Sequence, residues 1–179
     1  MLTTDNSVLL VIDVQEKVFR AINQKERLLD NLQRLIKGIK VLEIPILLTE
    51  QYPQGLGTTI PEIAQLLLDS KPIPKICFSC CGDAGFLQEL KKLNRKQVLI
   101  AGIESHVCVY QTDADLFAAD YEVYAVSDAI FSRTDQNRDI GLKMMTQLGA
   151  KLTSTEAALF ELLKVAKSDK FKAISQIVK

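Results

Sequence analysis

Hydrophobic residues in this chain form short continuous runs, and helical repeats separate the runs. The clearest runs cover residues 8–12, 44–48 and 97–102. Apolar stretches of this length are typical of strands buried on both faces. The next segment has apolar residues three and four positions apart, which predicts an amphipathic helix carrying Leu28, Leu29, Leu32, Leu35, Ile36 and Ile39.

The rest of the chain continues this alternation. Shorter extended segments are predicted at residues 72–78, 121–126 and 151–152, and the turn-forming residues 49–59 are predicted as a loop. Gly149 is expected to close one helix as a left-handed cap, and Thr153 with Glu156 has the spacing of a capping box. The remaining helices are predicted over residues 61–68, 84–93, 107–119, 135–148, 157–166 and 171–178.

Alternating strands and helices predict an α/β fold, specifically a doubly wound, mainly parallel six-stranded sheet with helices on both faces. Because no linker or internal repeat is visible, residues 1–179 are expected to form one domain. A C-terminal helical extension begins at about residue 168. Its apolar stripe has two interpretations, since it could cover the core or pack on a neighbouring subunit.

Composition and charge narrow the possible functions. Lys plus Arg and Asp plus Glu each number 22, so no net charge favours nucleic acid or an acidic membrane surface as a partner. No apolar segment approaches the length of a membrane span. The first residues lack the basic start and apolar core of a signal peptide, so we expect a cytoplasmic protein.

Three of the four cysteines cluster at Cys77, Cys80 and Cys81. The pair Cys77-x-x-Cys80 could belong to a zinc site or a redox module, but no second Cys/His pair follows it. The single histidine, His106, excludes a His-rich metal site and a Ser-His-Asp triad. We therefore interpret the clustered thiols as structural or incidental, and we expect neither a metal nor another cofactor.

Cys108 is the strongest candidate for chemistry. It follows the strand at residues 97–102, and Ser105 resembles a helix N-cap, which would place the thiol in the first helical turn. Unpaired backbone N–H groups and the helix dipole favour a thiolate there, so we expect a lowered pKa and a nucleophilic sulfur. The other interpretation is a buried cysteine that acts as a small hydrophobic residue.

Asp13 and Lys75 are candidates to assist that sulfur. Asp13 ends the first strand, and sites in such sheets form beyond the carboxyl ends of strands where the strand order reverses. Asp13 could then accept the thiol proton, although it could equally cap the following helix. Lys75 would stabilise both anions, although most lysines lie on a solvated surface.

Three segments occur in the order and spacing of the isochorismatase-like cysteine hydrolases, which the chain resembles from about residue 7 to residue 159. They are Val-Ile-Asp13-Val-Gln15, Lys75-Ile-Cys-Phe-Ser and Ala-Gly-Ile-Glu-Ser-His-Val-Cys108-Val. The segment at residues 49–57 is similar to that of the subgroup called isochorismatase domain-containing proteins.

This resemblance implies a catalytic triad of Asp13, Lys75 and Cys108 on a doubly wound α/β fold. The cysteine attacks a carbonyl or nitrile-type carbon, the aspartate shuttles the proton, and the lysine assists electrostatically. The resemblance also implies a cis peptide bond between Ile103 and Glu104, and an oxyanion hole formed by the backbone N–H groups of Glu104 and Cys108.

Two departures from the family limit the possible reactions. Metal-dependent nicotinamidases carry an Asp-x-His motif and a further histidine where this chain has Gln51-Tyr52-Pro53. Isochorismatases that cleave a vinyl ether lack the nucleophilic cysteine. Both reactions are therefore disfavoured here.

Gln15, Phe19, Gln51, Tyr52, Phe78 and His106 are predicted to line a small pocket that suits a compact planar amide or imide. We therefore predict a metal-independent cysteine hydrolase, which cleaves a C–N bond of a small-molecule substrate through a Cys108 thioester and forms a homo-oligomer. The alternative is a non-catalytic oligomeric binding or scaffold protein with a vestigial site.

Overall fold

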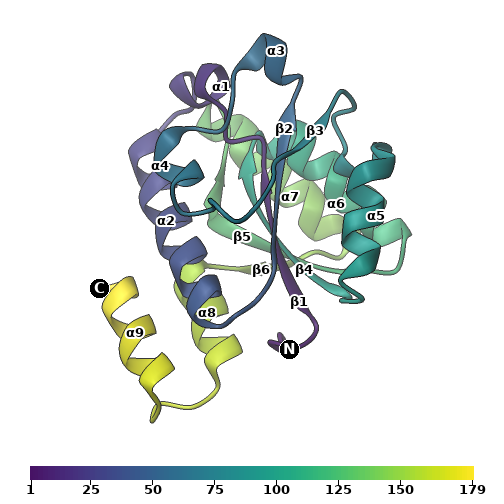
Figure 1. Cartoon of the computed structure of the whole chain (residues 1–179). Coiled ribbons are helices and arrows are strands. Elements are labelled where there is room, and N and C mark those ends of the chain that lie inside the picture. Colours follow the sequence, from purple (N-terminus) through teal and green to yellow (C-terminus); the bar gives the residue numbers. More distant parts are fainter.

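A computed structural model describes residues 1–179 and contains one six-stranded sheet in the order β3-β2-β1-β4-β5-β6 (Figure 1). All neighbouring strands are parallel, so the predicted fold class is confirmed. The strands are β1 (Ser7–Ile12), β2 (Ile46–Gln51), β3 (Ile73–Lys75), β4 (Gln97–Ile103), β5 (Glu122–Phe131) and β6 (Lys151–Thr153).

Helices cover both faces of the sheet. One face carries α2 (Lys25–Val41), α8 (Thr155–Leu163) and α9 (Asp169–Val178), and the other carries α5 (Ala84–Lys92), α6 (Tyr110–Ala118) and α7 (Asp135–Leu148) (Figure 1). Shorter elements complete the chain: α1 (Glu16–Arg20), α3 (Pro53–Leu56), α4 (Pro61–Ala64), a 3-10 turn at Cys80–Gly82 and a π-helical turn at Ser105–Val109.

The strand β1 shows why the sheet requires two helical layers. All six of its side chains are buried, and the five apolar ones alternate between two apolar clusters. Leu9 and Val11 join the cluster beneath α2 and α8, whereas Leu10 and Ile12 join the cluster beneath α5, α6 and α7. Successive side chains of a strand point to opposite faces, so a continuous apolar run must be covered on both sides.

The strand order reverses at β1, which lies between β2 and β4. Ile12 pairs with Thr49 on one side and with Gly102 on the other. β1 ends at these pairs, while β2 continues to Gln51 and β4 to Ile103 at the same carboxyl edge of the sheet. This is the place where a parallel α/β sheet forms its binding site.

Two local predictions between the second and third strands were wrong. The segment at residues 49–59 is not simply a loop, because β2 continues through Gln51 and Pro53–Leu56 forms the helical turn α3. The helix predicted from Pro61 to residue 68 ends at Ala64, and turns follow it.

Two predictions near the C-terminus also change. The cap of α8 is Ser154, whose hydroxyl accepts a hydrogen bond from the backbone N–H of Ala157, so Thr153 is not the cap. The fifth strand extends to Phe131, five residues beyond its predicted end. The apolar stripe of α9 covers its own chain, because Ile174 is fully buried against the cluster that includes α2 and α8.

Gly149 closes α7 in the left-handed conformation, with φ of 114°, as the sequence predicted. No helix in the structure is both long and apolar enough to span a membrane.

Candidate active site

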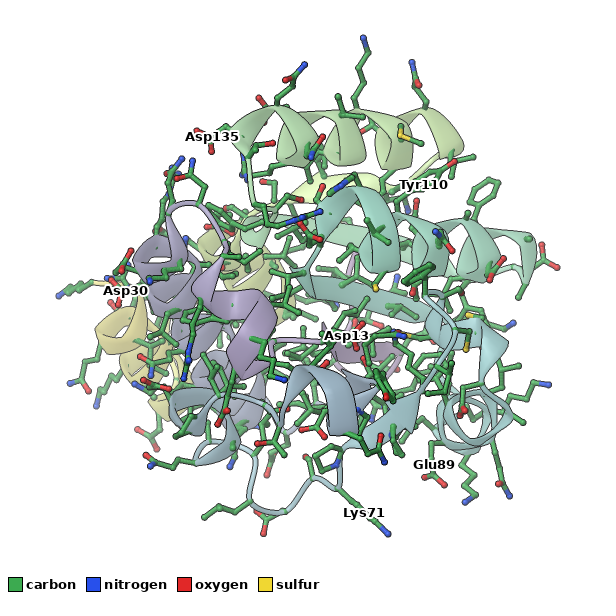
Figure 2. All side chains as sticks on the ribbon, turned by 90° about the horizontal axis from the view of Figure 1, so that it is seen from above. Asp13, Asp30, Lys71, Glu89, Tyr110 and Asp135 are labelled. Carbon is green, nitrogen blue, oxygen red and sulfur yellow. The ribbon has the colours of Figure 1, made fainter.

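Asp13 immediately follows β1 and is held by Thr49 of the neighbouring strand β2. Its backbone N–H donates to the carbonyl oxygen of Thr49, and the Thr49 hydroxyl donates to Oδ1 of Asp13 at 2.7 Å. The residue has φ of 52°, a left-handed conformation that aspartate tolerates better than most residues. Only 3% of Asp13 is exposed, and in Figure 2 it lies near the centre of the molecule.

Lys75 is the last residue of the edge strand β3, and its ammonium group is completely buried. Nζ lies 2.6 Å from Oδ2 of Asp13 and 2.8 Å from Oε1 of Gln51. It also donates to the carbonyl oxygens of Cys77 and Phe78, at 3.3 and 3.0 Å. An ammonium group has three protons, so these four acceptors use all of its donor capacity.

The surroundings of Lys75 keep it charged. Burial is the largest single influence and lowers the pKa of the ammonium group, but the charge of Asp13, the hydrogen bond to it and the neighbouring Cys80 and Cys108 together raise the pKa of Lys75 above its ordinary value. Asp13 and Lys75 therefore form a buried ion pair. Asp13 is not a helix cap, and Lys75 does not lie on a solvated surface.

Cys108 lies in the π-helical turn that precedes α6. Ser105 was predicted to be the N-cap, but the residue at the cap position before this turn is Glu104. Instead, the Ser105 hydroxyl donates to the carbonyl oxygen of Arg138 at 2.8 Å, which ties the turn to α7. π-Helical turns are rare in proteins, and those that do occur are often found at functional sites.

The prediction of a lowered thiol pKa at Cys108 was wrong. Burial raises the pKa of this thiol, and the negative charge of Asp13 raises it further, whereas Lys75 lowers it only in part. Cys108 is 7% exposed, so little water is available to stabilise a thiolate. The resting sulfur is therefore protonated, and it must lose its proton to a neighbouring base before it can attack a carbon.

A cavity of about 110 Å³ at this edge of the sheet brings Asp13 and Cys108 together. The negative charge of Asp13 is also one of the causes that raise the pKa of the Cys108 thiol, because the carboxylate lies close to the sulfur. The Asp13–Lys75 ion pair and the sulfur thus meet at one cleft. The nine lining residues are Asp13, Val18, Gln51, Leu56, Phe78, Ile103, Glu104, Val107 and Cys108.

Of the six predicted pocket residues, Gln51 and Phe78 line the cavity. Gln15 does not, because its side-chain amide donates to the carbonyl oxygens of Gln51 and Gly57 and accepts from the N–H of Gln51. Gln15 therefore fixes the loop that carries Gln51. This role follows from contacts across 36 and 42 residues of sequence.

Phe19, Tyr52 and His106 also lie outside the lining of the cavity. Phe19 packs against the apolar cluster beneath α2, and Tyr52 is 51% exposed. The Nδ1 atom of His106 lies 3.2 Å from the hydroxyl of Ser132. The residues that the sequence prediction missed are the apolar walls, Val18, Leu56, Ile103 and Val107.

The backbone before Cys108 has two unusual features. The peptide bond between Ile103 and Glu104 is cis, at the position that the family resemblance implies. Gly102 has φ of 124°, and a Cβ atom there would lie 2.2 Å from the carbonyl oxygen of Ile12. Only glycine therefore allows β4 to approach β1 this closely beside Asp13.

All four cysteines are free thiols. Cys80 is fully buried, with its sulfur 3.8 Å from the Thr49 hydroxyl, and burial raises its pKa to about 12. No cluster of histidine, cysteine or acidic side chains has the arrangement of a metal site. The Thr112 hydroxyl accepts from the backbone N–H of Cys80 and donates to the carbonyl oxygen of Cys108, so it joins the two segments.

These features define an α/β protein with a thiol, a carboxylate and an ammonium group at the carboxyl edge of a parallel sheet. The family model described as "Isochorismatase domain" matches residues 7–157. The chain therefore belongs to the isochorismatase family of hydrolases, and the predicted resemblance is confirmed.

Individual relatives cover nearly the whole chain. The secreted isochorismatase effector Isc1 of Phytophthora sojae is 39% identical over 97% of this chain and 85% of the relative. Isochorismatase domain-containing protein 2 of Danio rerio is 38% identical over 99% of this chain and 89% of the relative. Among solved structures, the MAR1 ribonuclease of Caenorhabditis elegans has a TM-score of 0.93 at 36% identity, covering 99% of this chain and 91% of that chain.

Proposed function

We propose that the protein is a metal-independent cysteine hydrolase that cleaves a C–N bond of a small molecule, with Cys108 as the nucleophile. The observation that carries this proposal is the buried ion pair of Asp13 and Lys75, at 2.6 Å, beside a thiol that lines the same cavity. A buried ion pair is costly to desolvate and is not by itself a gain in stability. Its position at the reactive edge of the sheet favours a role in chemistry.

In the first half of the reaction, Asp13 takes the proton from the thiol of Cys108 while the sulfur attacks the carbonyl carbon. The carbonyl oxygen becomes an oxyanion, for which the backbone N–H groups of Glu104 and Cys108 are the proposed donors. Asp13 then returns the proton to the leaving nitrogen. The C–N bond breaks, and ammonia or an amine leaves behind a Cys108 thioester.

In the second half, Asp13 accepts a proton from water as the water oxygen attacks the thioester carbon. The C–S bond breaks, the carboxylic acid leaves, and the proton returns to the sulfur. Lys75 stays charged throughout and stabilises the carboxylate and the transient thiolate. This explains how a thiol with a raised pKa can be activated, because the proton has only to move to an adjacent carboxylate.

Replacement of the nucleophile tests this proposal. A panel of small amides, imides and carbamoyl compounds is incubated with the wild-type protein and with Cys108→Ala, and ammonia or amine release is measured. We expect Cys108→Ala to lose at least a thousandfold in rate while it unfolds at the same temperature as the wild type. Cys81→Ser is the matched control, because Cys81 does not line the cavity, and it should retain full activity.

Retained turnover in Cys108→Ala would refute the nucleophile. A covalent acyl group on Cys108, detected by mass spectrometry after rapid acid quenching, would support the thioester directly.

One observation favours a second candidate, a non-catalytic binding or scaffold protein with a vestigial site. The raised pKa of Cys108 leaves the resting sulfur unreactive unless Asp13 acts as its base. Iodoacetamide distinguishes the two candidates. In a catalytic site, alkylation of Cys108 should slow at least tenfold in Asp13→Asn, whereas a vestigial site should show no difference.

A ribonuclease activity, suggested by the name of the Caenorhabditis elegans protein, has little support in this chain. The net charge is zero, and no lysine, arginine or histidine lines the cavity. Ligand pockets usually measure roughly 300–1,000 Å³, so a cavity of about 110 Å³ is too small for a nucleotide. Incubation with labelled single-stranded RNA should give no cleavage that depends on Cys108.

We also propose that the protein acts as a homo-oligomer in the cytoplasm. Exposed apolar side chains in the segment after β3 support an assembled form: Ile76 is 71% exposed, and Phe78, which lines the cavity, is 54% exposed. Sedimentation velocity at micromolar concentration tests this, and a single monomeric species would contradict it.

A further inference from the structure

The charges around the cavity are unevenly distributed. Among the nine lining residues, Asp13 and Glu104 are acidic and none is basic. The remaining lining is mainly apolar, and Gln51 is its only amide. A charged group that enters a poorly hydrated space of this kind needs an opposite charge or several hydrogen bonds to replace its water.

Lys75 cannot supply that opposite charge. Its Nζ atom is fully buried and is surrounded by four oxygen acceptors, among them Asp13 and Gln51. Its positive charge is already balanced by Asp13. Gln51 is also largely committed, because its carbonyl oxygen accepts from Lys75 and its amide nitrogen donates to the carbonyl oxygen of Ile76.

Glu104 is held at the wall by Arg133. Its Oε1 atom accepts from the backbone N–H of Arg133 at 3.2 Å and from Nε at 3.0 Å. The two side chains differ in hydration, since Glu104 is 13% exposed and Arg133 is 58% exposed. Arg133 therefore compensates Glu104 from a position that water and salt screen, and only Glu104 of this pair is among the residues that line the cavity.

We propose that Glu104 is a specificity-determining residue that excludes anionic substrates and restricts the site to uncharged small amides. The assignment of a substrate class rests on the proposed function, whereas the exclusion of anions is a property of the cavity itself. A carboxylate on the substrate would meet Glu104 at the wall with no free cation to pair with, because Lys75 and Asp13 already neutralise each other. The small volume adds a second restriction, because only a short acyl group fits beside Cys108.

Alkylation of Cys108 measures the charge preference without any assumption about hydrolysis. Iodoacetamide and iodoacetate have nearly the same shape and react by the same displacement, in which the sulfur–carbon bond forms and iodide leaves. They differ by one negative charge. The rate of alkylation of Cys108 by iodoacetamide is divided by its rate with iodoacetate, both measured by peptide mass spectrometry. This ratio is then divided by the same ratio for N-acetylcysteinamide, an uncharged small thiol.

We expect this normalised ratio to be at least ten for the wild-type protein. Glu104→Gln retains the shape and the oxygen acceptor but removes the charge, so the ratio should fall at least threefold. Arg133→Gln removes the partially compensating cation, so the ratio should rise. Glu89→Gln is the matched control, because Glu89 lies on α5 at the periphery of the molecule, away from Asp13 (Figure 2), and the ratio should not change.

A wild-type ratio near one, or a ratio in Glu104→Gln equal to that of the wild type, overturns the proposal. If Glu104→Gln does not fold, Arg133→Gln still tests the proposal. An unchanged or lower ratio in Arg133→Gln would also overturn it. Circular dichroism and thermal unfolding establish which variants are folded.

Hydrolysis of two matched amides separates this inference from the proposed function. Butyramide and succinamate differ by a terminal methyl or carboxylate group, and we expect kcat/KM to favour butyramide at least tenfold. If neither is cleaved while the alkylation ratio is high, the hydrolase proposal fails and the exclusion of anions stands. If both amides are cleaved equally and the alkylation ratio is near one, the exclusion of anions fails and the hydrolase proposal stands.

Discussion

Asp13, directly after β1, and Asp113, in the first turn of α6, both bring a carboxyl group into the interior of this protein. The oxygens of Asp13 accept from Lys75 and from the Thr49 hydroxyl. Both oxygens of Asp113 are buried and have no hydrogen-bond partner. Burial raises the pKa of Asp113 to about 7, so about half of these carboxyl groups hold a proton at pH 7, whereas Asp13 is paired with a cation.

The difference shows that burial alone does not identify a functional carboxylate. A charge is retained inside a protein when neighbouring groups replace its water, and otherwise the group takes up a proton. Asp13 has such neighbours and lines the cavity that Cys108 also lines, which is the arrangement that the proposed proton transfer requires. Asp113 has neither a partner nor a place among the residues that line the cavity.

The largest effect should follow from removal of the cation that compensates Asp13. Lys75→Met leaves a buried carboxylate without its ion-pair partner, which typically costs about 3–5 kcal/mol in the free energy of unfolding. Urea unfolding at pH 7.5 measures the loss. The double variant Asp13→Asn/Lys75→Met should recover most of it. If the loss of stability in the double variant equalled the sum of the losses in Asp13→Asn and Lys75→Met, Asp13 and Lys75 would not be coupled.

A change of opposite sign is expected at Asp113. Its folded-state pKa is raised from 3.8 to about 7, so the folded protein binds a proton that the unfolded chain releases between these values. Stability should therefore decrease as pH rises from 4 to 7. Asp113→Asn removes this dependence and should be more stable than wild type at pH 8 by as much as about 4 kcal/mol.

Urea unfolding of both proteins between pH 4 and pH 8 tests this prediction. Equal slopes of stability against pH would show that Asp113 ionises without penalty. Asp115→Asn on the same helix is the control, because Asp115 is exposed, and it should leave the slope unchanged.

The smallest effect is expected from loss of the hydroxyl that positions Asp13. Thr49→Val keeps the shape of the side chain but removes the 2.7 Å hydrogen bond to Oδ1. A hydrogen bond to a charged group contributes about 1.5–3 kcal/mol, so we expect the free energy of unfolding to fall by about 1.5 kcal/mol. The alkylation rate of Cys108 should also change, because Asp13 is less well oriented, and an unchanged rate would assign Thr49 a purely structural role.

The fold was predictable from sequence because the strands that form the centre of the sheet are unusually apolar. The segments that became β1 and β4 admit almost no other interpretation, since their side chains are buried on both faces. The prediction failed where tertiary contacts decide the backbone. Ser105 has the chemistry of a helix cap, but its hydroxyl bonds to Arg138, 33 residues away.

The triad residues could be proposed from order and spacing, whereas the walls of the cavity could not. Val18, Leu56 and Val107 have side chains that occur throughout any core, and only the folded chain shows which of them reach Cys108. The pKa of Cys108 was also misjudged for a physical reason. The position of a thiol near a helix start is visible in sequence, but the burial that opposes its ionisation is not.

The strand order has a consequence for how this protein is made on the ribosome. β1 is synthesised first and occupies the middle of the sheet, yet β4, one of its two partners, ends only at Ile103. The emerging chain must therefore keep a strand with five consecutive apolar residues from aggregating while about ninety more residues are added. Its nascent form should depend on chaperones until the fourth strand leaves the exit tunnel.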